Sequence, residues 1–167
     1  MNVLFERFVS RLLLDYGPPS MRVETQLGQS TAYWWNENPF RWQRPRLRPD
    51  ITLFDGVTGR PCLILDAKYK PLGPARRPSP EDLYQLTLYS LSLGEQQHVP
   101  ARVVYPQVTG PTTLPVPCLE FRGLSGRCTM ASVSFYGVPM LSITAALQSR
   151  NELELQRAVR AITNVIQ

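Results

Sequence analysis

Cysteine and histidine are the scarce residue types in this sequence of 167 residues. Its three cysteines, Cys62, Cys118 and Cys128, are an odd number and lack the short spacings of zinc ligands. This count argues against a disulfide framework and a zinc site, and it predicts reduced, mostly buried thiols. The single histidine, His98, gives little support to a Ser-His-Asp or histidine-metal mechanism.

Long apolar runs, internal repeats and low-complexity tracts are absent as well. No apolar run approaches the roughly 20 residues that span a bilayer, and the apolar first residues carry charges that a secretory signal would lack. We therefore expect a cytoplasmic protein without a membrane partner, folded as a single domain over residues 1–167. The net charge of +5 and the pI near 9.4 favour a polyanionic partner.

Hydrophobic periodicity divides the chain into alternating elements. Apolar residues at helical spacing predict helices over 2–15, 80–93 and 152–166. The second begins at Ser79-Pro80 and ends at Gly94, which are a typical start and stop. Alternating or continuous apolar runs predict strands over 21–27, 51–54, 62–67, 102–105 and 132–136.

This order predicts a mixed α/β (α+β) fold with a central sheet flanked by helices. Pro106 closes the strand over 102–105, and residues 107–131 form loops with at most one further strand. The core covers about residues 1–140. The amphipathic C-terminal helix, at about 151–166, is an addition to that core.

Two apolar strands carry acids where they can meet. Asp50 opens one strand, and Asp66 ends the next one, sixteen residues later. Side chains at i and i+2 of a strand share a face, so Asp66 and Lys68 point the same way. Two carboxylates and the carbonyl of Ala67 offer the oxygen ligands that Mg²⁺ prefers, and Mg²⁺ can activate water for attack on a phosphodiester. The alternative is a surface ion pair, but the apolar run before Asp66 indicates a buried strand, where charges need partners or a metal.

Three short motifs resemble the PD-(D/E)XK nuclease superfamily: Pro49-Asp50, Asp66-Ala67-Lys68, and Gln85-Leu-Thr-Leu-Tyr89 on the following helix. More narrowly, the stretches LFERFV, RPDITLF, LILDAKYK and DLYQLTLYS are similar to the nuclease domain of McrC, the cleavage subunit of modification-dependent restriction systems. The resemblance covers roughly Leu4 to Tyr105. It implies a restriction-endonuclease-like core and a Mg²⁺-dependent DNA endonuclease of a restriction or anti-phage defence system, with Mn²⁺ able to substitute.

The resemblance also implies roles for single residues. Its metal ligands would be Asp50, Asp66, the carbonyl of Ala67, and Glu6 on the first helix. Lys68 would align or activate the attacking water, and Gln85 and Tyr89 would support the phosphate or the water. From the residues alone, Tyr89 can equally pack in an almost wholly apolar helix. Glu6 can equally be a solvated flank, with Glu24 as the alternative acid.

A segment rich in aromatic residues and arginine precedes Asp50. Arginine neutralises phosphate, and flat rings stack on exposed bases. The candidate DNA contacts are Arg41, Trp42, Arg44, Arg46 and Arg48, with Lys70 as a further basic position. Alternatively, the tryptophans anchor a long loop on the core and the arginines only solvate it.

Several partners and two other functions follow from the resemblance. Cleavage subunits of this type act with a GTP-dependent partner, which implies a motor NTPase (GTPase or ATPase), and a separate recognition subunit is a further candidate. One active site per chain favours a homodimer or sequential nicking. The chain could also be an assembly subunit whose terminal helix docks the motor, or a DNA-binding module that no longer cuts; intact Asp50, Asp66 and Lys68 argue against the last.

Overall fold

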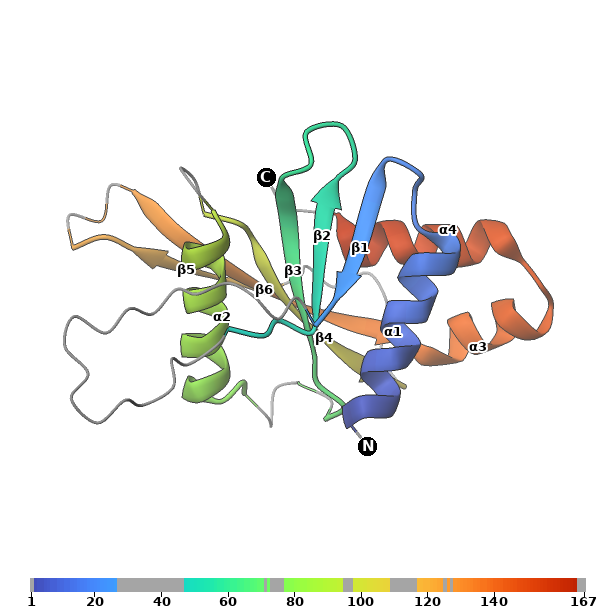
Figure 1. Ribbon diagram of the computed structural model, residues 1–167. Coiled ribbons are helices and arrows are strands. Elements are labelled where there is room, and N and C mark those ends of the chain that lie inside the picture. Colours follow the sequence, from blue (N-terminus) through green and yellow to red (C-terminus); the bar gives the residue numbers. More distant parts are fainter. Residues whose placement is uncertain are drawn as a thin grey trace, which may run out of the picture.

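The computed structural model describes residues 2–26, 47–70, 72, 77–94, 98–108, 117–124, 126 and 128–164. The helices in this part of the chain are α1 (Asn2–Tyr16), α2 (Pro80–Leu93), α3 (Met140–Gln148) and α4 (Glu152–Thr163). The strands in it are β1 (Met21–Thr25), β2 (Ile51–Asp55), β3 (Pro61–Ala67), β4 (Ala101–Gln107), β5 (Cys118–Arg122) and β6 (Thr129–Pro139). They form a mixed sheet with helices on both faces, which confirms the predicted fold class (Figure 1).

The sheet combines an antiparallel half with a parallel centre. In the order β1-β2-β3-β4-β6-β5, strands β1, β2 and β3 form an antiparallel meander, and β3, β4 and β6 run parallel. Strand β5 pairs with β6 in the antiparallel sense at the edge. A parallel step needs a crossover connection, and α2 supplies the one from β3 to β4. The end of β3 therefore lies inside the sheet, next to the start of β2.

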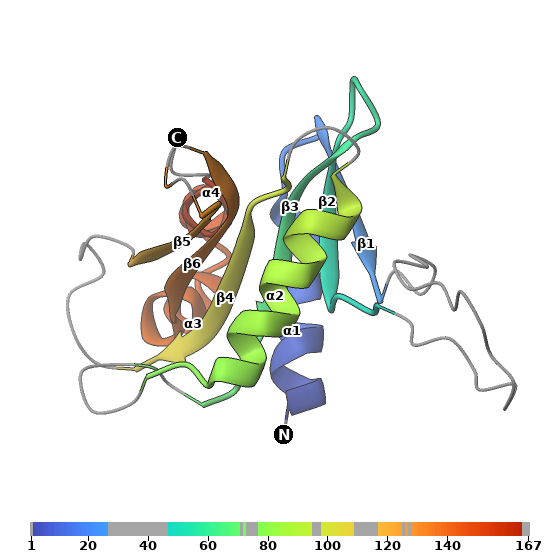
Figure 2. The ribbon, with the colours of Figure 1, turned by 90° about the vertical axis from the view of Figure 1, so that its left-hand side faces the viewer.

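Helices cover the two faces of the sheet unequally. Of the described helices, α2 alone lies on one face, and α1, α3 and α4 lie on the other (Figures 1 and 2). Strand β3 is consequently buried on both sides: Leu63 and Leu65 join the core that includes α1 and α4, and Ile64 joins the core that includes α2. Because both faces of β3 are buried, its sequence is a continuous apolar run and does not alternate between apolar and polar residues. None of the described helices is both long and apolar enough to cross a membrane.

Helix α4 is part of the larger core. Leu155, Val159 and Ile162 form its apolar stripe, are at most 1 % exposed, and belong to the same buried cluster as Val9 of α1. Ile166, the last member of the predicted stripe, lies outside the described residues. The helix that was expected to be an addition to the core thus helps to close it.

The importance of α4 for stability can be measured with a matched pair of substitutions. Leu155→Ala is expected to lower the free energy of unfolding by about 2–5 kcal/mol, because it leaves a cavity in a closed core. Leu155 is 1 % exposed, whereas Leu153 on the same helix is 58 % exposed. Leu153→Ala is expected to change stability by less than about 0.5 kcal/mol. Urea unfolding measures both, and equal effects would contradict the packing of α4 on the core.

A buried arginine fastens the end of α4 to the sheet. Arg102 on β4 is 1 % exposed, and its Nε donates to Ser134 Oγ on β6 at 2.9 Å. Its terminal nitrogens donate to backbone carbonyls at the end of α4: Ala161 at 3.3 Å, Ile162 at 2.5 Å and Asn164 at 2.6 Å. The last carbonyls of a helix lack partners within the helix and carry its negative dipole end. Arg102 supplies both the donors and the positive charge that this end needs.

Helix α3 has no counterpart among the predicted elements. It continues directly from β6, and the residue at its N-cap is Pro139, which offers no side chain to cap a backbone N–H. The sequence therefore carries no polar start signal at this point. Ile143 and Ala146 of α3 are buried in the same core as α4.

Strand β4 runs through Pro106 to Gln107, so the prediction that Pro106 closes the strand is wrong. Val104 accepts the N–H of Lys68, which means that its backbone groups point toward β3. The backbone groups of Pro106, two residues on, point the same way. Ala67, the last residue of β3, is already opposite Val104, so Pro106 lies beyond the paired stretch of β3 and β4, where a missing N–H is tolerated.

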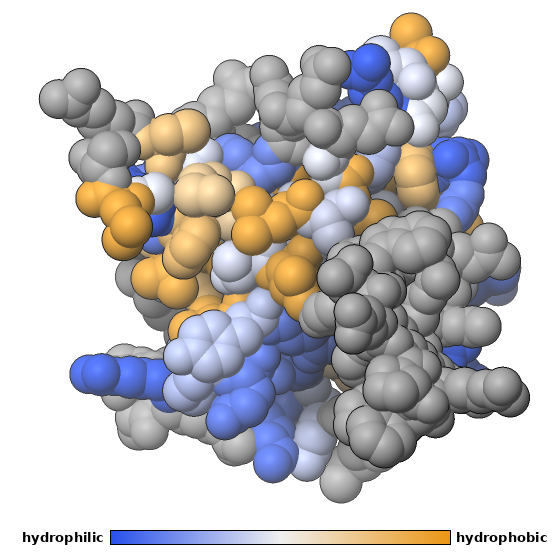
Figure 3. Space-filling view, turned by 60° about the vertical axis from the view of Figure 1, so that its left-hand side comes forward, coloured by the Kyte–Doolittle hydropathy of each residue, from blue (hydrophilic) through white to orange (hydrophobic). Residues whose placement is uncertain are grey.

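Strand β5 exposes both of its faces to solvent. Figure 3 shows apolar side chains gathered in the upper part of this side of the molecule, with hydrophilic ones below. The exposed apolar residues of β5 and β6 are Leu119, Phe121 and Met130. The expectation of mostly buried cysteines is wrong, because Cys118 on β5 and Cys128 before β6 are both exposed.

Candidate active site

A β-hairpin brings Asp50 and Asp66 to the same end of the sheet. Strands β2 and β3 are antiparallel, and Ile51 is opposite Leu65. The residue before Ile51 therefore lies near the residue after Leu65. The turn at the other end of the hairpin is organised by Asp55, whose Oδ1 accepts two backbone N–H groups.

Asp50 is a half-buried carboxylate held against the end of β3. Its Oδ2 accepts the backbone N–H of Ala67 at 2.9 Å. Burial raises the pKa of Asp50 to about 6, and the charge of Asp66 adds to the rise. Glu6 acts in the same direction, whereas the Ala67 hydrogen bond and Lys68 oppose it. Burial and neighbouring acids together thus disfavour the ionised form of Asp50.

Asp66 is 4 % exposed and extends from β3 toward α2, where Lys68 also points. Nζ of Lys68 lies 2.9 Å from Asp66 Oδ2. Among the described residues, this ammonium is the polar partner that the structure gives to that buried oxygen. Burial raises the pKa of Asp66, and the charge of Lys68 offsets only part of this rise.

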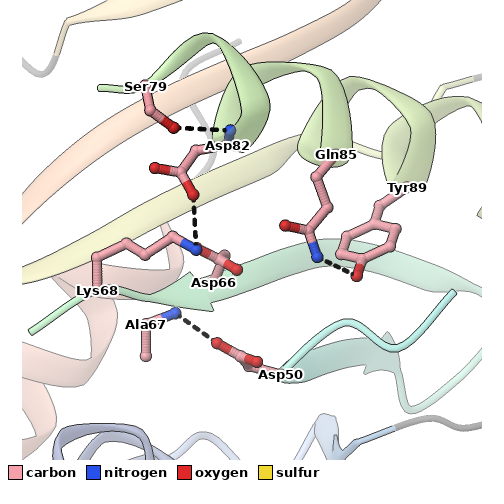
Figure 4. A network of polar contacts seen from close by, with 8 residues as sticks. All are labelled: Asp50, Asp66, Ala67, Lys68, Ser79, Asp82, Gln85 and Tyr89. Carbon is pink, nitrogen blue, oxygen red and sulfur yellow. Dashed lines mark hydrogen bonds and ion pairs between the residues drawn. The ribbon is translucent and has the colours of Figure 1, made fainter. Parts of the chain in front are cut away.

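Lys68 is held between two carboxylates. Its Nζ lies 2.9 Å from Asp66 Oδ2 and 2.9 Å from Asp82 Oδ1, and Figure 4 shows the ammonium between β3 and the first turn of α2. Burial opposes the charge of Lys68, but Asp82 and Asp66 together raise its pKa above the usual value. The side chain is therefore a fixed ammonium at neutral pH.

Asp82 is the site residue that sequence reasoning missed. In the sequence, Ser79-Pro80-Glu81-Asp82 predicts only the start of a helix. The structure confirms that start: Ser79 Oγ accepts the backbone N–H of Asp82 at 3.1 Å. Burial alone would raise the pKa of Asp82, but Lys68 and Ser79 outweigh it and hold the pKa below its usual value. The sequence signal that could have identified Asp82 is the order of the elements: α2 is the next helix after the strand that leads into Asp66-Ala67-Lys68, and Asp82 lies in its first turn.

Glu6 approaches the same end of the sheet from α1. It is half-buried, and its Oε1 accepts a hydrogen bond from Gln26 Nε2 at 3.3 Å. Its charge contributes to the raised pKa of both site aspartates. Glu24, the alternative acid, forms an ion pair with Arg22 on β1 instead. Of the two acids, Glu6 is the one that is electrostatically coupled to the site.

Gln85 and Tyr89 form a pair one helical turn apart on α2. Gln85 Nε2 donates to Tyr89 Oη at 2.6 Å, on the side of the helix that faces the strands (Figure 4). Tyr89 is 3 % exposed and belongs to the core under α2. Among the described residues, no hydrogen bond links this pair to Asp50, Asp66 or Lys68. Tyr89 therefore packs in the core, as the alternative interpretation expected. Its hydroxyl still holds the side chain of Gln85, which leaves a polar role for Gln85 open.

The expected DNA contacts are only partly described. Arg41, Trp42, Arg44 and Arg46 lie outside the described residues. Arg48 is exposed two positions before Asp50, and Lys70 is exposed two positions beyond Lys68. A pocket beside Lys68 is lined by Tyr69, Lys70 and Arg77 and, at the start of α2, by Ser79 and Asp82.

The donor atoms of the site suit a hard cation. In the part of the chain that the structure describes, no three Asp, Glu, His or Cys side chains form a ready-made metal cage. Two carboxylates with raised pKa values nevertheless come together there, and Lys68 is the described cation that lies against one of them. The N–H of Ala67 points to Asp50, and the carbonyl of a strand residue points the same way as its N–H. These oxygens match the preferences of Mg²⁺.

A comparison with known families matches the part of the chain that holds this site. The model of the family described as McrBC 5-methylcytosine restriction system component matches residues 1–106. This range is more than half of the chain and includes all the site residues above, from Glu6 on α1 to Tyr89 on α2. No curated protein matches the sequence. The chain belongs to the family of McrBC 5-methylcytosine restriction system components.

Proposed function

We propose that this chain is the cleavage component of its restriction system, a metal-dependent DNA endonuclease of the PD-(D/E)XK type that hydrolyses phosphodiester bonds. The observation that carries the proposal is the meeting of Asp50, Asp66 and Lys68 where β2 begins and β3 ends. Lys68 offsets only part of the cost of burying these two acids, so the arrangement lowers the stability of the fold and is explained better by a function than by folding. In phosphodiester hydrolysis, the two carboxylates would hold a metal ion and the ammonium would stabilise negative charge on the phosphate.

The metal in this proposal is Mg²⁺, with Mn²⁺ able to substitute. Asp50, Asp66, the carbonyl of Ala67 and Glu6 would hold it, one or two ions in all. When bound, Mg²⁺ supplies a Lewis acid that polarises the phosphate and lowers the pKa of water. The raised pKa values of the two aspartates favour this role: burial is their main cause and nearby acids add to it, and a bound cation would offset both effects.

Lys68 fits an orienting role better than proton removal. A lysine acts as a general base only when its pKa is lowered, and the two carboxylates raise that of Lys68. We therefore assign its ammonium to orienting the attacking water and to stabilising negative charge on the phosphate. Gln85 is assigned to the same phosphate or water, and Tyr89 holds Gln85 in place.

The partners in this proposal are DNA, a motor NTPase and a recognition subunit, in the cytoplasm. Arg48 and Lys70, both exposed and near the site, are the described residues assigned to the DNA backbone. A homodimer would place two sites on the two strands. The apolar stripe of α4 is not available for docking the motor, because Leu155, Val159 and Ile162 fill the chain's own core.

Cleavage of supercoiled and linear DNA tests the proposal. We expect the chain to cut DNA in Mg²⁺ or Mn²⁺ and not in EDTA. Lys68→Ala is expected to slow cutting by about 10²- to 10³-fold, because it removes a preorganised charge at the reacting phosphate. Lys70→Ala serves as the control, since it removes the other lysine of the chain and should weaken DNA binding without slowing the bound complex.

The outcomes separate the candidate functions. Cutting only after a cognate motor NTPase is added would make the chain a partner-dependent cleavage subunit. Retained DNA binding without cutting, with and without the motor, would contradict the endonuclease proposal and favour a non-cleaving DNA-binding module.

A further inference from the structure

We propose that Asp82 is a positioning residue of the active site, whose carboxylate holds the ammonium of Lys68 in place from the side of α2. The catalytic consequence of this inference rests on the proposed nuclease function. The positioning itself rests on contacts within the described residues and can be tested without activity.

Lys68 makes two ion pairs of equal length with acids from different elements. Its Nζ is 2.9 Å from Asp66 on β3 and 2.9 Å from Asp82 on α2. The exposed fractions of these side chains are 28 % for Lys68, 5 % for Asp66 and 31 % for Asp82. Partial burial makes the pairs stronger than pairs at an open surface. The ammonium is thus tied to both layers that border the site.

One of these two acids has a second task. Asp66 is a proposed metal ligand, and a cation bound to its carboxylate neutralises the charge that attracts Lys68. The cation and the ammonium also repel each other. Lysine has a flexible four-carbon stem, so an ammonium held by Asp66 alone would leave the site when the metal arrives. Asp82 has no such competing task and retains Lys68.

Asp82 itself is rigidly placed. It is the third residue of α2, and Ser79, which caps this helix, accepts its backbone N–H at 3.1 Å. The next turns of α2 are anchored by Leu86 and Tyr89, which are 1 % and 3 % exposed in the core below the helix. A short side chain on a capped and packed helix has little freedom. The position of Lys68 is therefore set by helix-sheet packing.

A purely structural role for Asp82 can be separated from the positioning role. An acid in the first turn of a helix also stabilises the helix dipole, and Glu81 has the same charge in the same turn but is exposed and makes no ion pair among the described residues. Asp82→Asn keeps the size of the side chain and the backbone cap. Glu81→Gln removes one charge from the helix start without touching Lys68, and is the matched control.

The first measurement is the NMR signal of the lysine ammonium groups. Lys68 and Lys70 are the two lysines of the chain, so protein labelled with ¹⁵N-lysine gives two signals, which Lys68→Gln assigns. We expect a slowly exchanging Lys68 signal in the wild type that persists on adding Mg²⁺. In Asp82→Asn this signal should exchange faster, and in Mg²⁺ it should disappear, while Lys70 and the Glu81→Gln spectrum stay unchanged.

The second measurement is DNA cleavage by the same variants. Asp82→Asn is expected to lower kcat by about 10- to 100-fold, as for residues that orient a catalytic group, with KM and the melting temperature nearly unchanged. Asp82→Glu should recover part of the rate. A Lys68 signal that is the same in Asp82→Asn and the wild type would overturn the proposal, and so would an altered signal with unchanged kcat. If wild-type protein does not cut at all, the nuclease function fails, and the NMR result alone decides whether Asp82 positions Lys68.

Discussion

Replacing Arg102 with methionine is expected to lower the free energy of unfolding by roughly 3–5 kcal/mol, because buried acceptors lose their donors at about 1–3 kcal/mol each. The acceptors are Ser134 Oγ and the carbonyls of Ala161, Ile162 and Asn164. The apolar stem of methionine fills much of the space of the arginine stem. The effect is smaller than the sum over four acceptors because the last turn of α4 can open to water. Urea unfolding followed by circular dichroism measures the loss.

The control for Arg102 is an arginine with an exposed partner. Arg122 on β5 forms an ion pair with Glu120, and both side chains are largely exposed, so Arg122→Met should cost less than about 1 kcal/mol. Hydrogen exchange shows where the structure opens: in Arg102→Met, the protection of backbone amides from exchange should fall first in the last turn of α4. A variant as stable as the wild type would contradict the role of Arg102 as the anchor of α4.

Asp50→Asn is expected to stabilise the metal-free protein and to abolish its function. The pKa of Asp50 is raised to about 6, above the value of about 3.9 expected in the unfolded chain. Ionisation of Asp50 thus opposes folding: its cost is absent below about pH 4, grows between about pH 4 and 6, and is complete above. Asparagine removes this cost and can still accept the N–H of Ala67. Allowing for partial exposure, we expect a gain of about 1–2 kcal/mol at pH 8, which fades as the pH falls to about 4.

The same variant tests the metal site. Mg²⁺ is expected to raise the melting temperature of the wild type, because it binds the folded state and relieves the repulsion between Asp50 and Asp66. Asp50→Asn should lose most of this shift and should cut DNA at least about 10³-fold more slowly, equivalent to several kcal/mol of transition-state stabilisation.

A matched control lies at the other end of the same strand. Asp55 is half-buried, and hydrogen bonds from Thr58 lower its pKa, so Asp55→Asn should slightly destabilise the protein and leave the Mg²⁺ shift and cleavage unchanged. Equal Mg²⁺ shifts in the wild type and Asp50→Asn would remove Asp50 from the metal site.

Local chemistry made a good part of this fold predictable from the sequence. The start of α2 follows from Ser79-Pro80 and its end from Gly94, because capping depends on a few neighbouring residues. The proximity of Asp50 and Asp66 follows from two apolar strands joined by a turn, since adjacent antiparallel strands return the chain to the same end of the sheet. The roles of these residues remain predictions.

Features that depend on contacts between residues distant in the sequence could not be predicted. Arg102 sits in an apolar run, and its partners are 32 to 62 residues away in the sequence. The pairing of Asp82 with Lys68 depends on where α2 crosses the end of β3, which no local pattern specifies. Helix α3 lacks capping signals because it continues directly from a strand. In each case the deciding information is tertiary packing, which overrides local propensity.

The packing of α1 against α4 has a consequence for synthesis in the cell. Helices α1 and α4 share one buried cluster, and more than a hundred residues separate them in the sequence, so the core on that face cannot close until α4 has left the ribosome. Glu6 belongs to α1, and its position near Asp50 and Asp66 depends on that closure. We therefore expect a nascent chain in which α4 has not yet emerged to lack the proposed activity, and to gain it only when α4 has packed against α1.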